Sequence, residues 1–454
     1  MEQLTGIDEE RYLEPVKKVG RGFYITVAFL LSIIAWGAFA WYTQFQTGLG
    51  ITGLNRPVFW GFYITNFVFF IGISHAGTLV SAILRLTQAG WRRPITRVAE
   101  AITVFTLPVG AMNVLFDVGR PDRILNIILH PQGRSPLIWD IGSISMYLTA
   151  SVIYLYLPLI PDIALCRDRI GGWRQELYRI LALGWRGTEA QKKRLKMGIG
   201  IMAVVVIPIA VSVHTVVSWI FGMTTRAGWH STIFGPYFVV GAIFSGIAAA
   251  ILAMAVVRKV FHMEHTLKPR HFDYMGLLLL VLTAAYIYFT FAEYLTVYYG
   301  YGGSATEGSL LTALFTGEFA LTFWVMVVFG FFVPGIILAF PQGRSIRGTV
   351  IASVLIVFFM WVKRFIIVVP SLSRQFLPYP TGFYQATWVE WSLTAASFAV
   401  FVLLYVVFSR MFPIVSVWEL KEGEEEAREK AEEAAKMLAP AGAPRQSRAS
   451  EVLG

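Results

Sequence analysis

Ionisable side chains inside long apolar stretches are the residues of this sequence that could do chemistry. Each costs a few kcal/mol at the centre of a membrane helix, so such residues are candidates for function. They are His75, Glu100, Asp117 and Asp140 in the first half, then His214, Glu293, Glu318, Lys363 and Arg364. Histidine titrates near neutral pH and a carboxylate can accept a proton, so the set predicts proton transfer within a membrane.

The same charges could instead have structural roles. The glutamates of the second half could form ion pairs with Lys363 and Arg364, which would hold helices together. Glu100 lies close to a predicted helix end, where a hydrated position at the membrane interface is expected. His75 could be a hydrogen-bonded structural histidine. These roles stay open beside proton transfer.

Redox centres bound by the chain itself are not expected. Cys166 is the single cysteine, whereas an iron–sulfur cluster typically takes four ligands. A haem held by two histidines needs facing residues, and His75 and His214 alone lie well inside apolar stretches, with His230 at an edge. We therefore expect no haem, iron–sulfur or metal site. Electrons could then pass only on a diffusible carrier such as a quinone and leave through a partner protein.

The elements that must position these residues are membrane-spanning helices. Hydrophobic residues make up 56% of the 454 positions and charged residues 15%, and a helix crosses the bilayer core with roughly 20 apolar residues. Ten runs satisfy this length: 21–44, 57–84, 96–116, 134–163, 196–221, 229–258, 273–299, 309–339, 345–371 and 389–412. The sequence predicts an all-α integral membrane protein with about ten transmembrane helices.

The distribution of basic residues predicts the orientation. The net charge is +10, but most of the lysines and arginines outside the runs fall on alternate connecting segments, as the positive-inside rule requires. Both termini are then cytoplasmic, and the basic excess reflects contact with a lipid bilayer and no nucleic acid. The prediction is a multi-pass protein of the bacterial cytoplasmic (inner) membrane.

An internal repeat predicts the domain organisation. At an offset of 174 positions, Gly61, Tyr63 and Gly72 align with Gly235, Tyr237 and Gly246, while His75 aligns with an alanine. We interpret this as two four-helix bundles, only the first of which carries the histidine. The predicted segments are an N-terminal part (1–20), a flanking helix with an external loop (21–56), the first bundle (57–163 and 196–221), a cytoplasmic loop (164–195), the second bundle (222–371), a tenth helix (372–418) and a charged tail (419–454).

Two cytoplasmic segments have recognisable patterns. The loop 164–195 interleaves Trp173, Ile180 and Trp185 with arginines, which favours an interfacial amphipathic helix over a plain basic loop. The tail, rich in Glu, Ala and Lys from Lys421 to Met437, predicts a solvated helix. The remainder, from Leu438 on, is expected to be disordered.

The most specific motif is the segment 115–123, Leu-Phe-Asp-Val-Gly-Arg-Pro-Asp-Arg, followed by Ser-Pro-Leu-Ile-Trp-Asp at 135–140. Asp117 and Arg120 could lock this turn as an ion pair, with Arg123 as further support. The motif resembles the signature of the NrfD, or polysulfide reductase membrane-subunit, family. The segments around His75 and His230 are most similar to NrfD-type subunits of bacterial alternative complex III, and to the quinol-oxidising subunit (ActC) more than to its paralogue.

The resemblance implies a cofactor-free subunit that oxidises menaquinol or another quinol near the external surface. Its implied partners are an extracytoplasmic iron–sulfur protein, a paralogous NrfD-like membrane subunit and cytochrome c-type subunits. Quinol oxidation releases two protons, and we expect His75 and Asp140 to accept them. At about 1.5 Å per residue the two differ in depth by about 13 Å. If that gap exists, Asp140 contacts quinol and His75 begins a proton path.

A second proton route and two other functions remain open. The route would use Glu100, His214, His230, Glu293, Glu318 and Lys363 or Arg364. One alternative function is the membrane anchor of a molybdenum enzyme of the polysulfide or dimethyl sulfoxide reductase type. The other is a secondary transporter, for which repeats and buried charges are also typical.

Overall fold

The computed structural model describes residues 9–224, 226–300, 305–374 and 383–438, and ten of its helices are long and apolar enough to cross a membrane. The prediction of an all-α membrane protein with ten spans is confirmed. The spans are α2 (Arg21–Thr47), α3–η2–α4 (Phe62–His75, Ala76–Val80, Ser81–Leu86), α5 (Thr96–Asp117), α7 (Pro136–Arg169), α9 (Glu189–Gly222), α10 (Phe234–Val260), α11 (Pro269–Gly300), α13–η5–α14 (Ala320–Val327, Val328–Phe332, Val333–Ala339), α15 (Ile346–Ser373) and α16 (Trp388–Met411).

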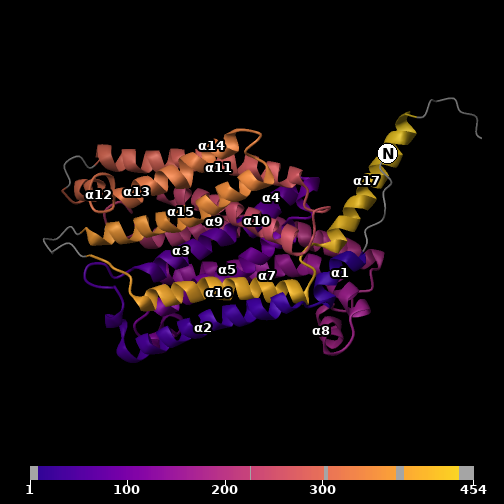
Figure 1. Cartoon of the computed structure of the whole chain (residues 1–454), viewed down its shortest axis with the longest axis horizontal. Helices are drawn as coiled ribbons and strands as arrows, with labels where there is room; N and C mark the ends of the chain where they lie inside the picture. Colours follow the sequence, from indigo (N-terminus) through magenta and orange to yellow (C-terminus); the bar gives the residue numbers. More distant parts are fainter. Residues whose placement is uncertain (1–8, 225, 301–304, 375–382, 439–454) are drawn as a thin grey trace, which may run out of the picture.

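Shorter helices lie at the two ends of this bundle. They are α1 (Glu9–Lys17), η1 (Leu49–Ile51), η3 (Gly90–Arg92), η4 (Pro121–Arg123), α6 (Asn126–Leu129), α8 (Trp173–Leu181), α12 (Ala305–Phe315) and α17 (Val417–Leu438). Helices α1, α8 and α17 gather at one end and α12 lies at the other (Figure 1). We call these the α17 end and the α12 end.

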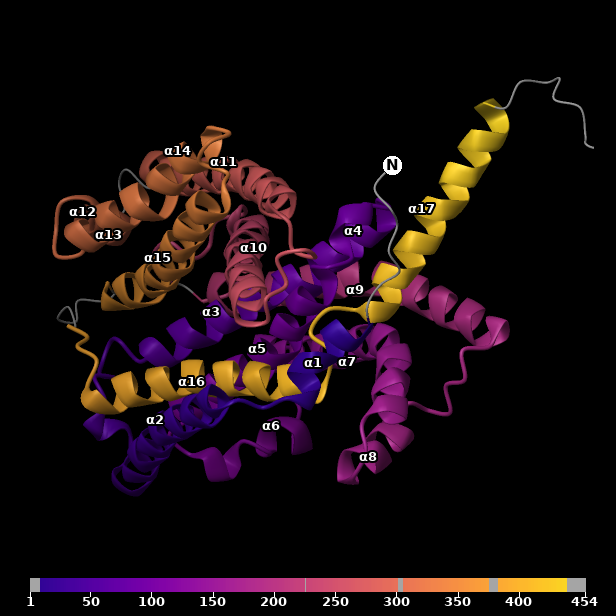
Figure 2. The same ribbon diagram turned by 45° about the vertical axis from the view of Figure 1, so that its right-hand side comes forward.

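The spans form three neighbouring groups. Helices α3, α5, α7 and α9 lie in the middle, with α2 and α16 on one side and α10, α11, α13, α14 and α15 on the other (Figures 1 and 2). Helix α3 contacts α5, α10, α15 and α16, so it lies at the centre of the molecule. Any residue on α3 is therefore enclosed by helices of the flanking groups.

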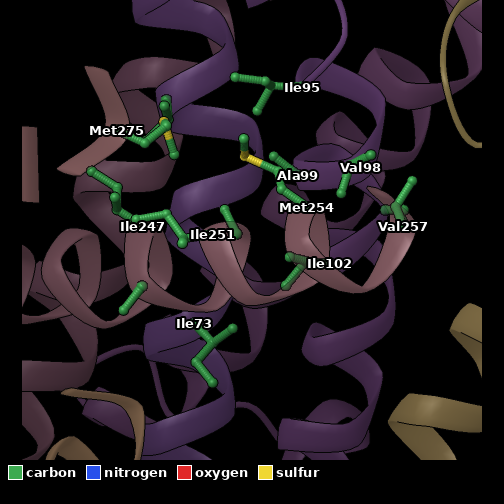
Figure 3. Close-up of a cluster of buried hydrophobic side chains, with 14 of the residues drawn as sticks. Ile73, Ile95, Val98, Ala99, Ile102, Ile247, Ile251, Met254, Val257 and Met275 are labelled. Carbon is green, nitrogen blue, oxygen red and sulfur yellow. The ribbon is translucent and has the colours of Figure 1, made fainter. Parts of the chain in front are cut away.

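The core between the middle group and α10 is built from aliphatic side chains. Ile73 of α3 and Val98 and Ile102 of α5 pack against Ile251 and Met254 of α10 (Figure 3). All five are 5% exposed or less. Burying such side chains supplies packing energy along the helix interfaces, which keeps the polar groups nearby in fixed positions.

The eighth span differs from its prediction. The apolar run 309–339 is not one helix, because α12 ends at Phe315 and α13 begins at Ala320. Gly317 lies in the break, where an added Cβ would lie 2.9 Å from Ala313 Cα. The span also contains the π-helical segment η5, and such segments occur often at functional sites. Glu318 falls in the break, and the prediction that it lies within a span is wrong.

The loop 164–195 is shorter than predicted, because α7 continues to Arg169 and α9 begins at Glu189. A capping box fixes the start of α9. The Thr188 hydroxyl accepts a hydrogen bond from the backbone N–H of Gln191, and the Gln191 side chain accepts one from the backbone N–H of Thr188. Between them, α8 forms the predicted helix. Trp173 and Ile180 are 72% and 68% exposed, as an interfacial helix requires.

The charged tail forms the predicted helix, but this helix begins before Lys421, at Val417, with buried residues. Glu419 at the start of α17 is 1% exposed. Its carboxylate forms ion pairs with Arg85 and Arg92 and accepts a hydrogen bond from Thr96 at 2.9 Å. We call this ion cluster the Glu419 clasp. The segment expected to be disordered lies, apart from Leu438, outside the described residues.

Candidate functional site

Two histidines from different helices meet in the middle of the molecule. His75 at the end of α3 and His214 of α9 are both fully buried, and their ring centroids lie 3.9 Å apart. A metal ion between two imidazole nitrogens, at about 2.0–2.1 Å per bond, would hold the centroids about 6 Å apart. The histidine pair is therefore a direct imidazole contact, and its geometry does not fit a haem held between the two rings.

The two rings differ in their hydrogen bonding. His75 Nε2 lies 2.5 Å from the Ala210 carbonyl and Nδ1 lies 3.2 Å from the Ile71 carbonyl. A neutral imidazole donates through one nitrogen only, so an added proton would find an acceptor already in place. Among the described residues, neither nitrogen of His214 has a partner. Leaving a buried polar group unpaired costs about 1–3 kcal/mol, which favours a functional role for this ring.

A buried guanidinium accompanies the histidine pair. Arg364 of α15 is 1% exposed, and its Cζ lies 5.2 Å from the centre of the Phe238 ring. Gly72 and Gly241 make room for it, since a Cβ at either would lie within 3.4 Å of its Nη2. Arg364 interacts electrostatically with both imidazoles. The structure thus brings together two residues of the predicted second route, His214 and Arg364, at His75.

One face of α7 carries polar side chains from the α12 end towards the α17 end. Asp140, Tyr147, Ser151 and Tyr154 recur at helical spacing and are 7% exposed or less. Tyr147 lies beside His75, with ring centroids 5.1 Å apart, and its hydroxyl donates to the Ser74 carbonyl at 3.1 Å. Asp140 is seven residues from Tyr147, which is about 10.5 Å along the helix. It therefore lies well away from the histidine pair.

Hydroxyl groups continue from the histidine pair towards the α17 end. Thr103 of α5 donates to the Ser74 carbonyl at 2.5 Å and accepts from the Thr78 backbone at 3.1 Å. The Thr78 hydroxyl in turn donates to Ser151 at 3.3 Å. With the α7 residues and the histidine pair, these groups form what we call the polar column.

The polar column ends at Glu100. Ser81 of α4 donates to the Glu100 carboxylate at 2.5 Å and lies 3.4 Å from the Tyr154 hydroxyl. Glu100 is 3% exposed, so the hydrated interface position expected from the sequence is wrong. It interacts electrostatically with Glu419 and Arg85 of the clasp. The start of α17 thus adjoins the end of the column, which explains the burial of Glu100.

At the α12 end, the column begins with an unpaired carboxylate. Asp140 Oδ1 is buried and has no hydrogen-bond partner within the described chain. The nearby motif behaves differently from its prediction, because Arg120 binds Asp122 through two contacts of 2.9 and 3.0 Å. Asp117 does not pair with Arg120, and its Oδ1 is also buried without a partner in the described chain. Arg123 is exposed.

Other predicted residues surround a second site, a cavity of about 30 Å³ beside α11 and α15. Glu293 and Lys363 line it, and the volume suits one or two water molecules. Glu293 accepts from Ser231, while Lys363 donates to the Tyr294 hydroxyl at 3.0 Å. We call this space the Glu293 cavity.

His230 lies at the edge of this region, 3.6 Å from Glu307 of α12. Burial raises the pKa of the Glu307 carboxyl, and His230 and the Gly228 backbone oppose that shift. Glu318 pairs with Arg374, so the predicted ion pair of Glu318 with Lys363 or Arg364 is wrong. No group of three or more metal-binding side chains occurs in the described part of the chain.

Several functional candidates were not identified from the sequence. Tyr147, Tyr154 and Thr103 are hydroxyl residues common in membrane helices, and only the spacing of the two tyrosines on α7 could have indicated the column. A second buried network, Asn66, Asn113 and Trp361, is fully hydrogen-bonded between α3, α5, α15 and α16. Because its groups are satisfied, it explains helix packing and suggests no chemistry.

The comparisons with known proteins identify the family of the chain. The family described as polysulphide reductase, NrfD, matches residues 50–375, so the chain belongs to the NrfD family. A Halobacterium salinarum membrane protein, provisionally assigned to a dimethyl sulfoxide reductase, is 29% identical over 75% of this chain and 74% of its own length. A selenate reductase subunit of Mesobacillus selenatarsenatis is 22% identical, over 86% and 94%. The menaquinone reductase integral membrane subunit of Nitratidesulfovibrio vulgaris is 24% identical, over 90% and 96%.

Proposed function

We propose that this chain is the quinone-reactive membrane subunit of an oxidoreductase complex, and that it oxidises a menaquinol at the α12 end, beside Asp140. The observation that carries the proposal is the polar face of α7, which has an unpaired buried carboxylate near its start and Tyr147 beside the histidine pair further along. The names of the relatives support the substrate class. One is a menaquinone reductase subunit, and another, from Archaeoglobus fulgidus, is an Hdr-like menaquinol oxidoreductase subunit.

The proposed reaction follows from what the column can accept. Oxidation of a quinol to a quinone releases two protons and two electrons. Asp140 takes the first proton from a quinol hydroxyl, because its free oxygen lies at the start of the column. Asp140 then passes this proton inward to His75, where both ring nitrogens face carbonyl oxygens, and takes the second proton from the quinol. Direct contact of His75 with the quinol headgroup is not needed.

The electrons pass to a partner protein at the α12 end, which the distribution of basic residues predicts to be extracytoplasmic. A docked iron–sulfur protein would receive them. The exposed apolar residues of the adjoining segment, Leu125, Ile128 and Leu129, offer a surface for such a partner or for the membrane interface.

Two types of complex fit this function. One is alternative complex III, with the chain in the ActC role beside a paralogous NrfD-like subunit and cytochrome c-type subunits. The other is a reductase of the dimethyl sulfoxide or selenate type, which the names of two relatives favour. A transporter has no support from the family or from these names.

The experiment is purification of the chain with its native partners from the membrane in which it is expressed naturally. A menaquinol analogue is added, and reduction of the redox centre of the co-purifying partner is followed by optical or electron paramagnetic resonance spectroscopy. We expect the menaquinol analogue to reduce the redox centre of the partner rapidly. No reduction in an intact complex would contradict the proposal. The identity of the partner, a molybdenum enzyme or a c-type cytochrome, decides between the two complexes.

A further inference from the structure

A groove lies outside the polar column, in the group of helices that contains α11 and the eighth span. It has a volume of about 350 Å³ between α11 and the interrupted eighth span, within the range of small-molecule sites. Most of its lining side chains are apolar or aromatic. They include Phe291, Tyr298, Phe315, Phe323, Trp324 and Phe332. We call it the aromatic groove.

The groove exists because the eighth span is irregular. The break after Phe315 turns α12 across the end of the groove, and the Trp324 indole donates to the Phe315 carbonyl oxygen at 3.0 Å. The π-helical segment η5 supplies Phe331 and Phe332 to its wall. Interrupted membrane helices are frequent at binding sites, because they expose groups that a regular helix covers.

One wall residue connects the groove with charged groups. Tyr294 lines both the aromatic groove and the Glu293 cavity. Its hydroxyl accepts a hydrogen bond from Lys363, which is 1% exposed, and this leaves the hydroxyl's own proton available to an acceptor. Across the same cavity, Glu293 Oε1 is buried without a partner among the described residues. An apolar groove for acyl chains alone would need none of these groups.

We infer that the aromatic groove binds an isoprenoid quinone, separate from the quinol that reacts beside Asp140. The flat ring packs against the aromatic walls, with one carbonyl oxygen accepting from the Tyr294 hydroxyl and the isoprenoid tail lying along the bilayer-facing surface. Aromatic rings favour offset or edge contacts with such a ligand. The choice of a quinone as the ligand rests on the proposed function. The location of the binding site in the aromatic groove does not.

The test uses the purified native complex and a photoreactive azido derivative of menaquinone, with the labelled peptides mapped by mass spectrometry. Labelling is expected on α11 or on the segment 315–332, and an excess of menaquinone is expected to remove it. An excess of phosphatidylglycerol is expected to leave the labelling unchanged. Removal by the phospholipid alone would show a lipid groove and overturn the inference.

Variants make the test specific. Leu295→Trp fills the groove and is expected to reduce labelling there at least tenfold. Leu277→Trp is the matched control, because Leu277 lies five turns away on the same face of α11 and is 49% exposed against 48% for Leu295. Lys363→Met removes the charge behind Tyr294 and is expected to weaken labelling about tenfold, although the groove stays open. Equal labelling in all three variants would overturn the inference.

The outcome also separates the two proposals. If labelling appears only near Asp140 and quinol still reduces the partner, this inference fails and the proposed function stands. If labelling appears in the groove but quinol reduces nothing, the proposed function fails and the groove remains a quinone site.

Discussion

The imidazole rings of His75 on helix α3 and His214 on helix α9 lie edge to face, with their ring centroids 3.9 Å apart. The two nitrogens of His75 face carbonyl oxygens, one on each helix, while His214 has no partner in the described chain. Leaving a buried ring unpaired costs about 1–3 kcal/mol, which favours a role of His214 in proton transfer over a role in packing alone. This relationship makes the histidine pair the centre of the polar column.

Replacement of the unpaired ring tests that role. His214→Phe keeps a ring of similar size, so we expect normal assembly but quinol turnover reduced roughly 10- to 100-fold, since proton transfer by a positioned group contributes about 10²–10⁴. The measurement is steady-state quinol oxidation by the purified complex. His130→Phe, at an exposed position, is the control. Equal rates in both variants would show that His214 is only a packing residue.

Tyr147 links the histidine pair to the hydroxyl groups of the column. Tyr147→Phe removes the hydroxyl that donates to the Ser74 carbonyl, and we expect turnover to fall about tenfold with a larger solvent isotope effect. Tyr405→Phe is the matched control, because that hydroxyl also donates to a carbonyl, Val98 at 2.9 Å, but lies outside the column. If the two variants lose activity equally, the loss reflects stability and not proton transfer.

Close packing of α5 against the π-helical segment η2 supports the column. A Cβ at Gly77 would lie 1.9 Å from the Ala99 carbonyl oxygen and 2.2 Å from Thr103 Oγ1. Gly77→Ala should therefore destabilise the protein by about 1–3 kcal/mol or more, as overpacking of a core does. Thermal unfolding in detergent is the measurement. Gly142→Ala, with nothing within 4 Å of its added Cβ, should change the midpoint little.

The Glu419 clasp should respond to pH. Burial alone would raise the pKa of Glu419, but Arg85 and Arg92 hold it below its ordinary value of 4.5. A depressed carboxyl pKa contributes stability above the ordinary value and loses it as the pH falls through the folded value. The attachment of α17 should therefore be complete at neutral pH and weaken below about pH 4.5.

Limited proteolysis of the α17 segment measures this attachment. Glu419→Gln should be cleaved several-fold faster than the native chain at pH 7, with the difference shrinking in acid. Glu432→Gln, which breaks only an exposed pair with Arg428, is the control. Cleavage that is fast in both, or pH-independent in the native chain, would contradict a role for the clasp.

Much of this architecture follows from the sequence. Ten apolar runs predict ten spans because a bilayer-spanning helix must satisfy its backbone internally, so length and apolarity suffice. The eighth span is the exception. The Phe315–Ala320 break contains Thr316, Gly317 and Glu318, but so short a polar interruption leaves the long run 309–339 apolar on average, so hydropathy does not separate α12 from α13.

The candidate site was predicted less completely. An ionisable residue inside an apolar run is a functional candidate whatever its neighbours are, and this predicted His75, His214 and Asp140 as candidates. Their partners depend on rotation about the helix axis and on neighbouring helices. Lys363 and Arg364 are adjacent in sequence, yet one faces the Glu293 cavity and the other the histidine pair. Tyr147 and Thr103 gain their importance only from the helices around them. The relation between the two predicted bundles stays a prediction.

The most direct test of the account is quinol turnover by the native complex carrying Asp140→Asn. The amide has the size of the carboxylate but cannot take a proton, so we expect turnover to fall at least 100-fold in a complex that assembles normally. Asp122→Asn, at the exposed partner of Arg120, should keep near-native turnover. Full activity of the Asp140→Asn complex would contradict a quinol site at the start of the polar column.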